Sequence, residues 1–221
     1  MDARSTSSRS SGLEVVRLGR LEFGEAWRLQ KERLDRRVAG EVGDALLLCE
    51  HEPVFTQGRR NAIEGMSHVA GIPVFAIERG GEMTWHGPGQ IVGYPVLDLT
   101  PRGRDLHRYL RDLEEVLIRA LAAFGLAGER RDGATGVWVG GSKVASLGVA
   151  VRRWVTYHGF ALNCDPDLRF FQLIRPCGFD PDVMTSMTRL LGRPCGIAEV
   201  EPAVVKEFGE VFRATCGSGP H

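Results

Sequence analysis

The fold is decided by residues 136–163, which read GVWVGGSKVASLGVAVRRWVTYHGFALN. Their valine, aromatic and small residues predict three consecutive strands, at residues 136–139, 143–152 and 155–163. Gly140-Gly141 predicts a hairpin turn between the first two strands, and Arg153-Trp154 predicts a tighter corner between the last two. Strands joined by such short turns run antiparallel, so this part of the sheet is not a parallel array.

Strand and helix patterns intermix along the rest of the chain. Apolar runs predict further short strands at residues 13–18, 45–49, 74–78 and 91–99. Helical periodicity predicts helices at residues 22–38 and 105–124, a short helix near 167–172, and a last helix that begins near Pro202. Because hairpins occur beside longer crossovers, the fold class is α/β with a mixed sheet and flanking helices.

The chain is expected to hold one domain between two tails. Residues 1–12 are rich in serine and arginine and lack an apolar core, so they predict a disordered tail and not a secretory signal. Residues 13–216 form the single predicted domain, and residues 217–221 a C-terminal tail. No apolar run in the sequence is long enough to cross a bilayer, so no membrane partner is expected.

Charge and cysteine content narrow the class of protein. The 28 basic and 28 acidic residues cancel, so nothing in the net charge indicates nucleic-acid binding. Lysine occurs only at Lys31, Lys143 and Lys206, and lysine can release a proton where arginine cannot. The five cysteines are odd in number and lack zinc-site spacing, so we expect no metal and a reducing, cytoplasmic location.

Residues 79–90, which read RGGEMTWHGPGQ, are unusually rich in glycine. Glycine lets a backbone approach a ligand closely, and the proline stiffens what would otherwise be a floppy loop. Two interpretations stay open on composition alone: a shaped wall of a ligand pocket, or an elaborate hairpin turn. His86 within it, and His158 further on, suit either the orientation of a substrate or a structural role.

Cys177 and Lys143 are the candidates for chemistry. Proline and glycine on either side of Cys177 fix the backbone around a thiol outside regular structure, which favours a nucleophile, although free cysteines are more often inert. Residues 136–143 resemble a phosphate-binding loop superficially, but Ser142-Lys143-Val144 replaces the required Gly-Lys-Ser/Thr. A lysine cation near a thiol lowers the thiol pKa. The alternative is a solvated lysine at a strand edge.

Taken in order, these motifs resemble the lipoyl(octanoyl) transferases of the biotin/lipoate protein ligase-like superfamily over about residues 13–214. The residues that carry the resemblance are Arg79-Gly80-Gly81, Thr84-x-His86-Gly87-Pro88-Gly89-Gln90, Gly93-Tyr94-Pro95, Asp98-Leu99, Gly141-x-Lys143-x-Ala145, Gly148-Val149, His158-Gly159-x-Ala161-x-Asn163 and Pro176-Cys177-Gly178.

The resemblance implies a mixed sheet with a second, smaller sheet and helices outside. It implies that Cys177 holds the acyl group as a thioester and that Lys143 lowers the thiol pKa and shuttles protons. It also implies a substrate-binding set of Arg79, Gly80, Gly81, Glu82, Met83, Thr84, Trp85, His86, Ser146, Leu147, Gly148, Gly159, Phe160 and Ala161.

The implied activity is transfer of octanoyl from acyl carrier protein to a specific lysine of lipoyl domains, without ATP or metal. The acceptors would be the 2-oxoacid dehydrogenase complexes and the glycine cleavage H protein, and the enzyme is expected to be a monomer. Three alternatives stay open: an ATP-dependent lipoate or biotin ligase, an amidotransferase that moves octanoyl between lipoyl domains, and a non-catalytic module that binds these partners.

Overall fold

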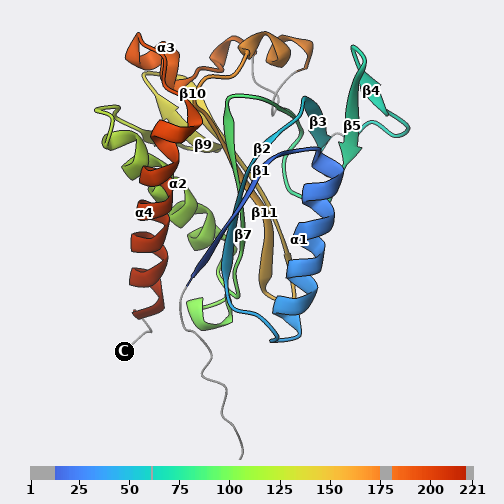
Figure 1. Cartoon of the computed structure of the whole chain (residues 1–221), viewed down its shortest axis with the longest axis vertical. Coiled ribbons are helices and arrows are strands. Elements are labelled where there is room, and N and C mark those ends of the chain that lie inside the picture. Colours follow the sequence, from blue (N-terminus) through green and yellow to red (C-terminus); the bar gives the residue numbers. More distant parts are fainter. Residues whose placement is uncertain (1–12, 61, 175–180, 218–221) are drawn as a thin grey trace, which may run out of the picture.

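A seven-stranded mixed sheet forms the centre of the molecule (Figure 1), in a computed structural model that describes residues 13–60, 62–174 and 181–217. Only β1 and β2 pair in parallel, and every other neighbouring pair in this sheet is antiparallel. The mixed sheet is therefore confirmed. In spatial order the strands are β1 (Glu14–Leu21), β2 (Ala45–His51), β7 (Gln90–Val96), β11 (Val155–Asn163), β10 (Ser142–Arg152), β9 (Ala134–Val139) and β8 (Glu129–Arg131).

A second, four-stranded sheet stands beside the first, as predicted. β3 pairs in parallel with β5 and antiparallel with β6. In spatial order the strands are β4 (His68–Val69), β5 (Ile72–Ala76), β3 (Val54–Gln57) and β6 (Met83–His86). Strand β6 lies inside the glycine-rich stretch 79–90, so this stretch is part strand and part turn.

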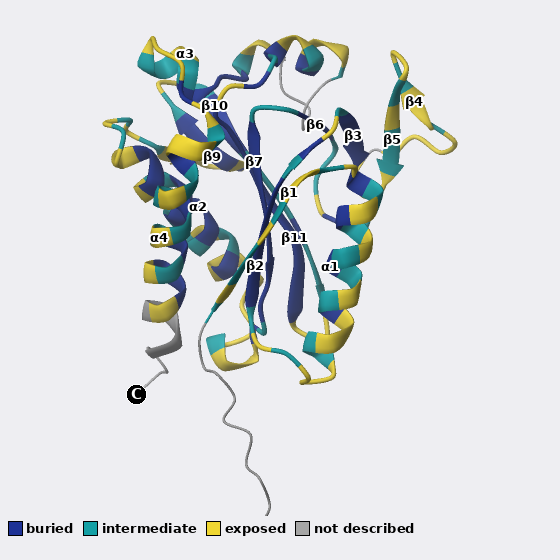
Figure 2. Ribbon diagram, viewed as in Figure 1, coloured by how far each residue is buried: buried dark blue, intermediate teal, exposed yellow. Residues whose placement is uncertain are grey.

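Helices cover both faces of the central sheet. α1 (Phe23–Val38) packs against β7 and β11 on one face, whereas α2 (Leu106–Ala122) and α4 (Ile197–Gly217) pack together on the other (Figure 1). Each face carries its own buried apolar cluster, and the central strands β2, β7 and β11 are buried along most of their length (Figure 2). Four short helices complete the described chain: α3 (Met187–Leu191) and 3-10 turns at Thr100–Arg102, Leu168–Leu173 and Pro181–Val183.

The two turns predicted between the three central strands are present, and their residues have positive φ. Gly140 and Gly141 both have positive φ, at 56° and 83°, in the hairpin between β9 and β10. Arg153 and Trp154 also have positive φ, at 50° and 65°, so the tight corner between β10 and β11 strains two residues that carry side chains. Local turn chemistry thus sets the register of the three central strands.

The last helix begins earlier than predicted. α4 starts at Ile197 and contains Pro202 in its interior. Val200 explains the difference, because it lies on the same buried face as Val204 and Phe208 and extends that face by one turn. Burial of this turn outweighs the hydrogen bond that the proline removes.

The predicted tails fall mostly beyond the described chain. Residues 1–12 and 218–221 lie outside the described residues, and Gly217 is the last residue of α4. Within the described ranges, no helix combines the length and the apolar composition needed to cross a bilayer.

Candidate functional site

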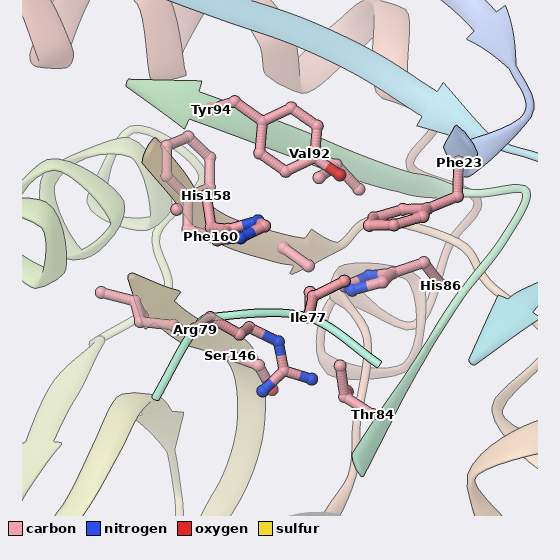
Figure 3. Close-up of a pocket in the computed structure, with 14 residues that line it drawn as sticks. Phe23, Ile77, Arg79, Thr84, His86, Val92, Tyr94, Ser146, His158 and Phe160 are labelled. Atoms are coloured by element: carbon pink, nitrogen blue, oxygen red, sulfur yellow. The ribbon is translucent and has the colours of Figure 1, made fainter. Parts of the chain in front are cut away.

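A pocket lies between the central sheet, the start of α1 and the segment that leads into β6 (Figure 3). It holds about 430 Å³ of space, its open mouth included. Most of its walls are apolar side chains and strand backbone. Its lining is Phe23, Ile77, Arg79, Thr84, His86, Val92, Tyr94, Ser146, Leu147, Gly148, His158, Gly159, Phe160 and Ala161.

Nine of the fourteen substrate residues implied by the resemblance line this pocket. They are Arg79, Thr84, His86, Ser146, Leu147, Gly148, Gly159, Phe160 and Ala161. The structure therefore brings together three segments of the chain that are far apart in sequence. The other five do not belong to the lining: Gly80, Gly81, Glu82, Met83 and Trp85.

Strand alternation separates these two groups within β6. Thr84 and His86 face the pocket, whereas Trp85 faces the opposite side. Trp85 is buried there, stacked on Phe170 at a ring-centroid distance of 4.9 Å and edge-on to Phe171 at 5.6 Å. Trp85 therefore belongs to the apolar cluster behind the pocket wall and not to the surface that lines the pocket.

Five further residues line the pocket that sequence reasoning did not assign to it: Phe23, Ile77, Val92, Tyr94 and His158. The period-2 pattern of β7 could have paired Val92 with Tyr94 on one face. His158 adjoins the predicted Gly159, and its sequence context makes it a candidate for orienting a substrate. Phe23 begins α1, and no local pattern in the sequence brings it to this sheet.

Glycine at position 148 lets the segment around Arg79 lie directly on β10. A Cβ on Gly148 would come within 2.7 Å of Arg79 Cδ and 3.1 Å of the Gly80 carbonyl oxygen. The Gly80 N–H donates to the Val149 carbonyl at 3.1 Å. The segment around Arg79 and Gly80 therefore contacts the backbone of the central sheet directly, and a larger residue at position 148 would prevent this contact.

Arg79 places a fixed positive charge at the pocket. Its Nη2 donates to the backbone carbonyl of Thr56 at 2.7 Å and to the Thr56 hydroxyl at 3.0 Å. Its Nη1 donates to the Gly80 carbonyl at 3.0 Å. The side chain is buried, so these bonds hold the guanidinium in one position.

Three buried histidines at the site are uncharged at neutral pH. Burial lowers the pKa of His51 to about 4 and that of His158 to about 4. Burial, with the nearby His51 and Arg79, lowers the pKa of His86 to about 3. The His51 Nε2 lies 2.6 Å from the hydroxyl of Tyr94, whose own pKa burial raises.

His158 lines the pocket with its backbone in a strained conformation. Its φ is 55°, in the left-handed region that residues with side chains rarely adopt. Its backbone N–H donates to Gln30 Oε1 at 3.1 Å, and its Nε2 lies 3.4 Å from Glu78 Oε2. The rings of His158 and His86 point toward each other across the pocket (Figure 3).

Lys143 is buried in β10, with 2 % of its surface exposed. β10 lies between β11 and β9, so the alternative of a solvated lysine at a strand edge is wrong. The Lys143 Nζ lies 5.5 Å from the centroid of the Trp138 ring, within cation–π range. The Lys143 carbonyl accepts from the Thr185 N–H at 2.9 Å.

Cys177 lies outside the described residues, which stop at Ile174 and resume at Pro181. Residues on either side of this gap reach one apolar cluster: Ile174 and Val183 both pack against the cluster that contains Phe171 and Met184. Met184 in turn pairs with Lys143 through an isolated bridge. The described parts of the chain thus return to the Lys143 strand immediately after the gap.

The other described cysteines behave as packing residues, as predicted. Cys49, Cys164 and Cys195 are free and buried. Burial raises the pKa of the Cys49 and Cys164 thiols well above their ordinary value, which keeps them protonated. No group of three or more metal-ligating side chains occurs among residues 13–60, 62–174 and 181–217.

Solved structures of ligases share this fold. A lipoate-protein ligase A bound with ATP superposes with a TM-score of 0.69 at 18% identity, over 92% of this chain and 85% of the other. A biotin protein ligase from Aquifex aeolicus, in complex with biotin and ATP, superposes with a TM-score of 0.60 at 13% identity, over 93% and 73%. The biotin/lipoate protein ligase-like fold is therefore confirmed.

Closer relatives are transferases. The octanoyltransferase of Geobacter metallireducens is 50% identical over 86% of this chain and 89% of its own length. That of Rubrobacter xylanophilus is 49% identical over 92% and 96%. A family model described as the lipoyl protein ligase A/B catalytic domain matches residues 22–209. The chain therefore belongs to the lipoyl protein ligase A/B catalytic family and, within it, to the octanoyltransferases.

Proposed function

We propose that this octanoyltransferase takes octanoyl from octanoyl-acyl carrier protein and delivers it, through a thioester on Cys177, to a specific lysine of lipoyl domains. The observation that carries the proposal is the burial of Lys143 on the strand that also supplies Ser146, Leu147 and Gly148 to the pocket. A lysine ammonium beside a thiol favours the thiolate and so lowers the thiol pKa.

In the first half-reaction, Lys143 accepts the Cys177 thiol proton, and the thiolate sulfur attacks the thioester carbonyl carbon of the donor. The bond from that carbon to the carrier sulfur breaks, and the carrier thiolate leaves with the proton from Lys143. One thioester replaces another, so the free-energy change is small.

In the second half-reaction, the lysine amine of the lipoyl domain attacks the carbonyl carbon of the octanoyl-enzyme. The bond from that carbon to the Cys177 sulfur breaks, an amide forms, and Lys143 moves the amine proton to the departing thiolate. Amide formation from a thioester runs downhill. Neither step consumes ATP or needs a metal.

The pocket suits an octanoyl tail. Phe23, Ile77 and Val92 supply apolar surface, and the histidines beside them carry no charge at neutral pH. Each methylene buried there contributes about 0.8 kcal/mol to binding. A chain of matched length is therefore favoured over a shorter one.

The substrate contacts follow from the pocket lining and from the resemblance. Arg79 and Thr84 would hold the polar end of the acyl thioester, and the other pocket-lining residues of the predicted set would enclose its chain. Gly80, Gly81, Glu82, Met83 and Trp85 would support that wall from behind. We further propose that the enzyme acts as a monomer and that it is cytoplasmic. The buried free thiols support the second point, because they suit a reducing compartment.

Mass spectrometry of the intact protein tests the covalent step. After incubation with octanoyl-acyl carrier protein, we expect one octanoyl group on the wild-type chain and none on Cys177→Ala. Cys195→Ala, which removes a buried cysteine elsewhere in the fold, is the matched control and should keep the adduct. A wild-type chain without an adduct would contradict the proposal.

The fold shared with ATP-bound lipoate-protein ligase A favours one rival, an ATP-dependent ligase. The two activities separate in one assay. The transferase works with octanoyl-carrier and no nucleotide, whereas a ligase works with free octanoate and ATP. Transfer from an octanoylated lipoyl domain, with no carrier present, would instead indicate an amidotransferase.

A further inference from the structure

A buried chain of hydrogen bonds runs from the pocket to the strand that carries Lys143. His86 Nδ1 lies 3.1 Å from Gln90 Oε1. Gln90 Nε2 donates to Asn163 Oδ1 at 2.9 Å, and Asn163 Nδ2 donates to the Thr185 carbonyl at 2.9 Å. The Thr185 N–H then donates to the Lys143 carbonyl at 2.9 Å.

Backbone carbonyls determine which groups donate and which accept in this series of hydrogen bonds. The Thr185 carbonyl only accepts, so Asn163 must present its NH₂ group there and its oxygen to Gln90. The Trp85 carbonyl, 3.4 Å from Gln90 Nε2, also only accepts. Gln90 therefore turns its NH₂ group toward Asn163 and Trp85 and its oxygen toward His86.

The direction of these hydrogen bonds decides which nitrogen of the His86 ring carries the proton. Because Gln90 offers an oxygen, Nδ1 of His86 must carry the proton. A neutral ring with its proton on Nδ1 leaves a lone pair on Nε2. Among the described residues no hydrogen bond to His86 Nε2 exists, and the ring lines the pocket.

The surroundings keep this ring neutral. Burial is the main cause that disfavours a positive charge on His86, and His51, whose ring centroid is 6.0 Å away, Arg79 and His158 add to it. His51 is locked in the same way, since its Nδ1 lies 3.3 Å from the Leu21 carbonyl and its Nε2 accepts from Tyr94.

We propose that Gln90 and Asn163 are positioning residues that lock His86 as its Nδ1–H tautomer, so that Nε2 presents an acceptor to an N–H donor of the bound substrate. The octanoyl chain has no such donor. On the proposed function, on which this assignment of the donor rests, the N–H belongs either to an amide of the carrier's thioester arm or to the lysine amine of the lipoyl domain.

Nitrogen-15 NMR of the ring nitrogens of the full chain tests the tautomer without any assay of activity. The His86 signals are assigned by their loss in His86→Gln. We expect a single neutral ring at pH 7, protonated at Nδ1 and bare at Nε2. A proton on Nε2, or a charged ring at pH 7, would overturn the proposal even if octanoyl transfer is confirmed.

Gln90→Met tests the positioning role, because methionine has a similar shape and neither hydrogen-bonding group. We expect the Nε2–H tautomer to appear and octanoyl transfer to fall about 10-fold, the scale of one lost hydrogen bond. Gln57→Met is the matched control: it removes another buried amide, which donates to the Ile63 carbonyl at 3.0 Å, and should change neither readout.

The two half-reactions distinguish the donors. Slower formation of octanoyl-Cys177 in Gln90→Met, with unchanged release, assigns the donor to the carrier arm. Slower transfer from isolated octanoyl-enzyme to a lipoyl domain assigns it to the amine. If the tautomer changes and neither step slows, the acceptor role of His86 is wrong. If Gln90→Met does not fold, the wild-type ring spectrum still decides the tautomer.

Discussion

Gly136 lies directly against the end of the Lys143 side chain. A Cβ on Gly136 would stand 2.5 Å from Lys143 Cε and 3.2 Å from Nζ, and 2.6 Å from the Ala145 carbonyl oxygen. The φ of Gly136 is 139°, where residues with side chains are strained. The glycine that gave residues 136–143 their superficial likeness to a phosphate-binding loop thus makes room for a buried lysine.

Gly136→Ala should therefore displace Lys143. We expect a loss of about 1–3 kcal/mol in stability from strain and overpacking, and formation of octanoyl-Cys177 at least about 10-fold slower. Urea unfolding and timed mass spectrometry measure the two effects. Gly133→Ala is the control, because Gly133 also has positive φ but has open space where its Cβ would lie. A displaced lysine predicts slower acylation in Gly136→Ala alone.

Lys143→Arg should lose more activity than conservation of charge suggests. Arginine keeps the positive charge but cannot release a proton, and its side chain is bulkier than the lysine that lies against Gly136. We expect the full transfer cycle to slow about 100-fold, the low end of general acid–base effects. Steady-state octanoylation of a lipoyl domain measures this, with exposed Lys206→Arg as the control. Wild-type rates in Lys143→Arg would rule out the proton shuttle.

Stability should fall in mild acid because of the three buried histidines. Their pKa values in the folded chain are about 3 to 4, below the ordinary value of about 6.5 that they regain on unfolding. As pH falls below about 6.5, the unfolded state therefore binds more protons than the folded state. The free energy of unfolding drops until pH nears 4, by up to about 3 kcal/mol per histidine.

Urea unfolding at pH 7, 6 and 5 measures this slope. His86→Gln removes one titrating ring and should flatten the slope, whatever it does to stability at pH 7. His68→Gln, at an exposed position, is the control. Equal slopes in wild type and His86→Gln would mean that His86 is not held neutral by burial.

Trp85→Leu should weaken the fold without changing which acyl chain is preferred. The tryptophan faces away from the pocket and stacks on Phe170, so its loss leaves a cavity in the cluster beside residues 168–174. We expect a loss of about 2–4 kcal/mol in stability. Competition between octanoyl and hexanoyl donors measures preference, and Trp154→Leu, at an exposed position, is the control. An altered preference would place Trp85 at the substrate after all.

Local signals explain what the sequence could predict. The β9–β10–β11 meander follows from Gly140-Gly141 and the corner at Arg153, because turn chemistry acts over a few residues. α1 and α2 follow from a strong helical period. The family motifs placed Arg79 and His86 in one site, and both line the same pocket.

Spatial relationships between distant segments explain what the sequence could not predict. From the sequence alone, Lys143 cannot be told from a solvated lysine, because its burial depends on β9 and β11, which lie on either side of its strand. Phe23 reaches the pocket because α1 crosses the sheet face that β7 and β11 expose. Pro202 predicted a helix start, and burial of Val200 on α2's side of the sheet overrode it.

The strand order also governs when the pocket comes into being during synthesis. Phe160 pairs with Gly93, and Asn163 with Gln90, across more than sixty intervening residues. The ribosome synthesises β7 long before its neighbour β11, and closing so long a loop is entropically slow. A nascent chain that ends before residue 142 thus carries its glycine-rich segment without the β10 and β11 residues that line the opposite side of the pocket. The acyl-binding pocket can therefore form only late in synthesis.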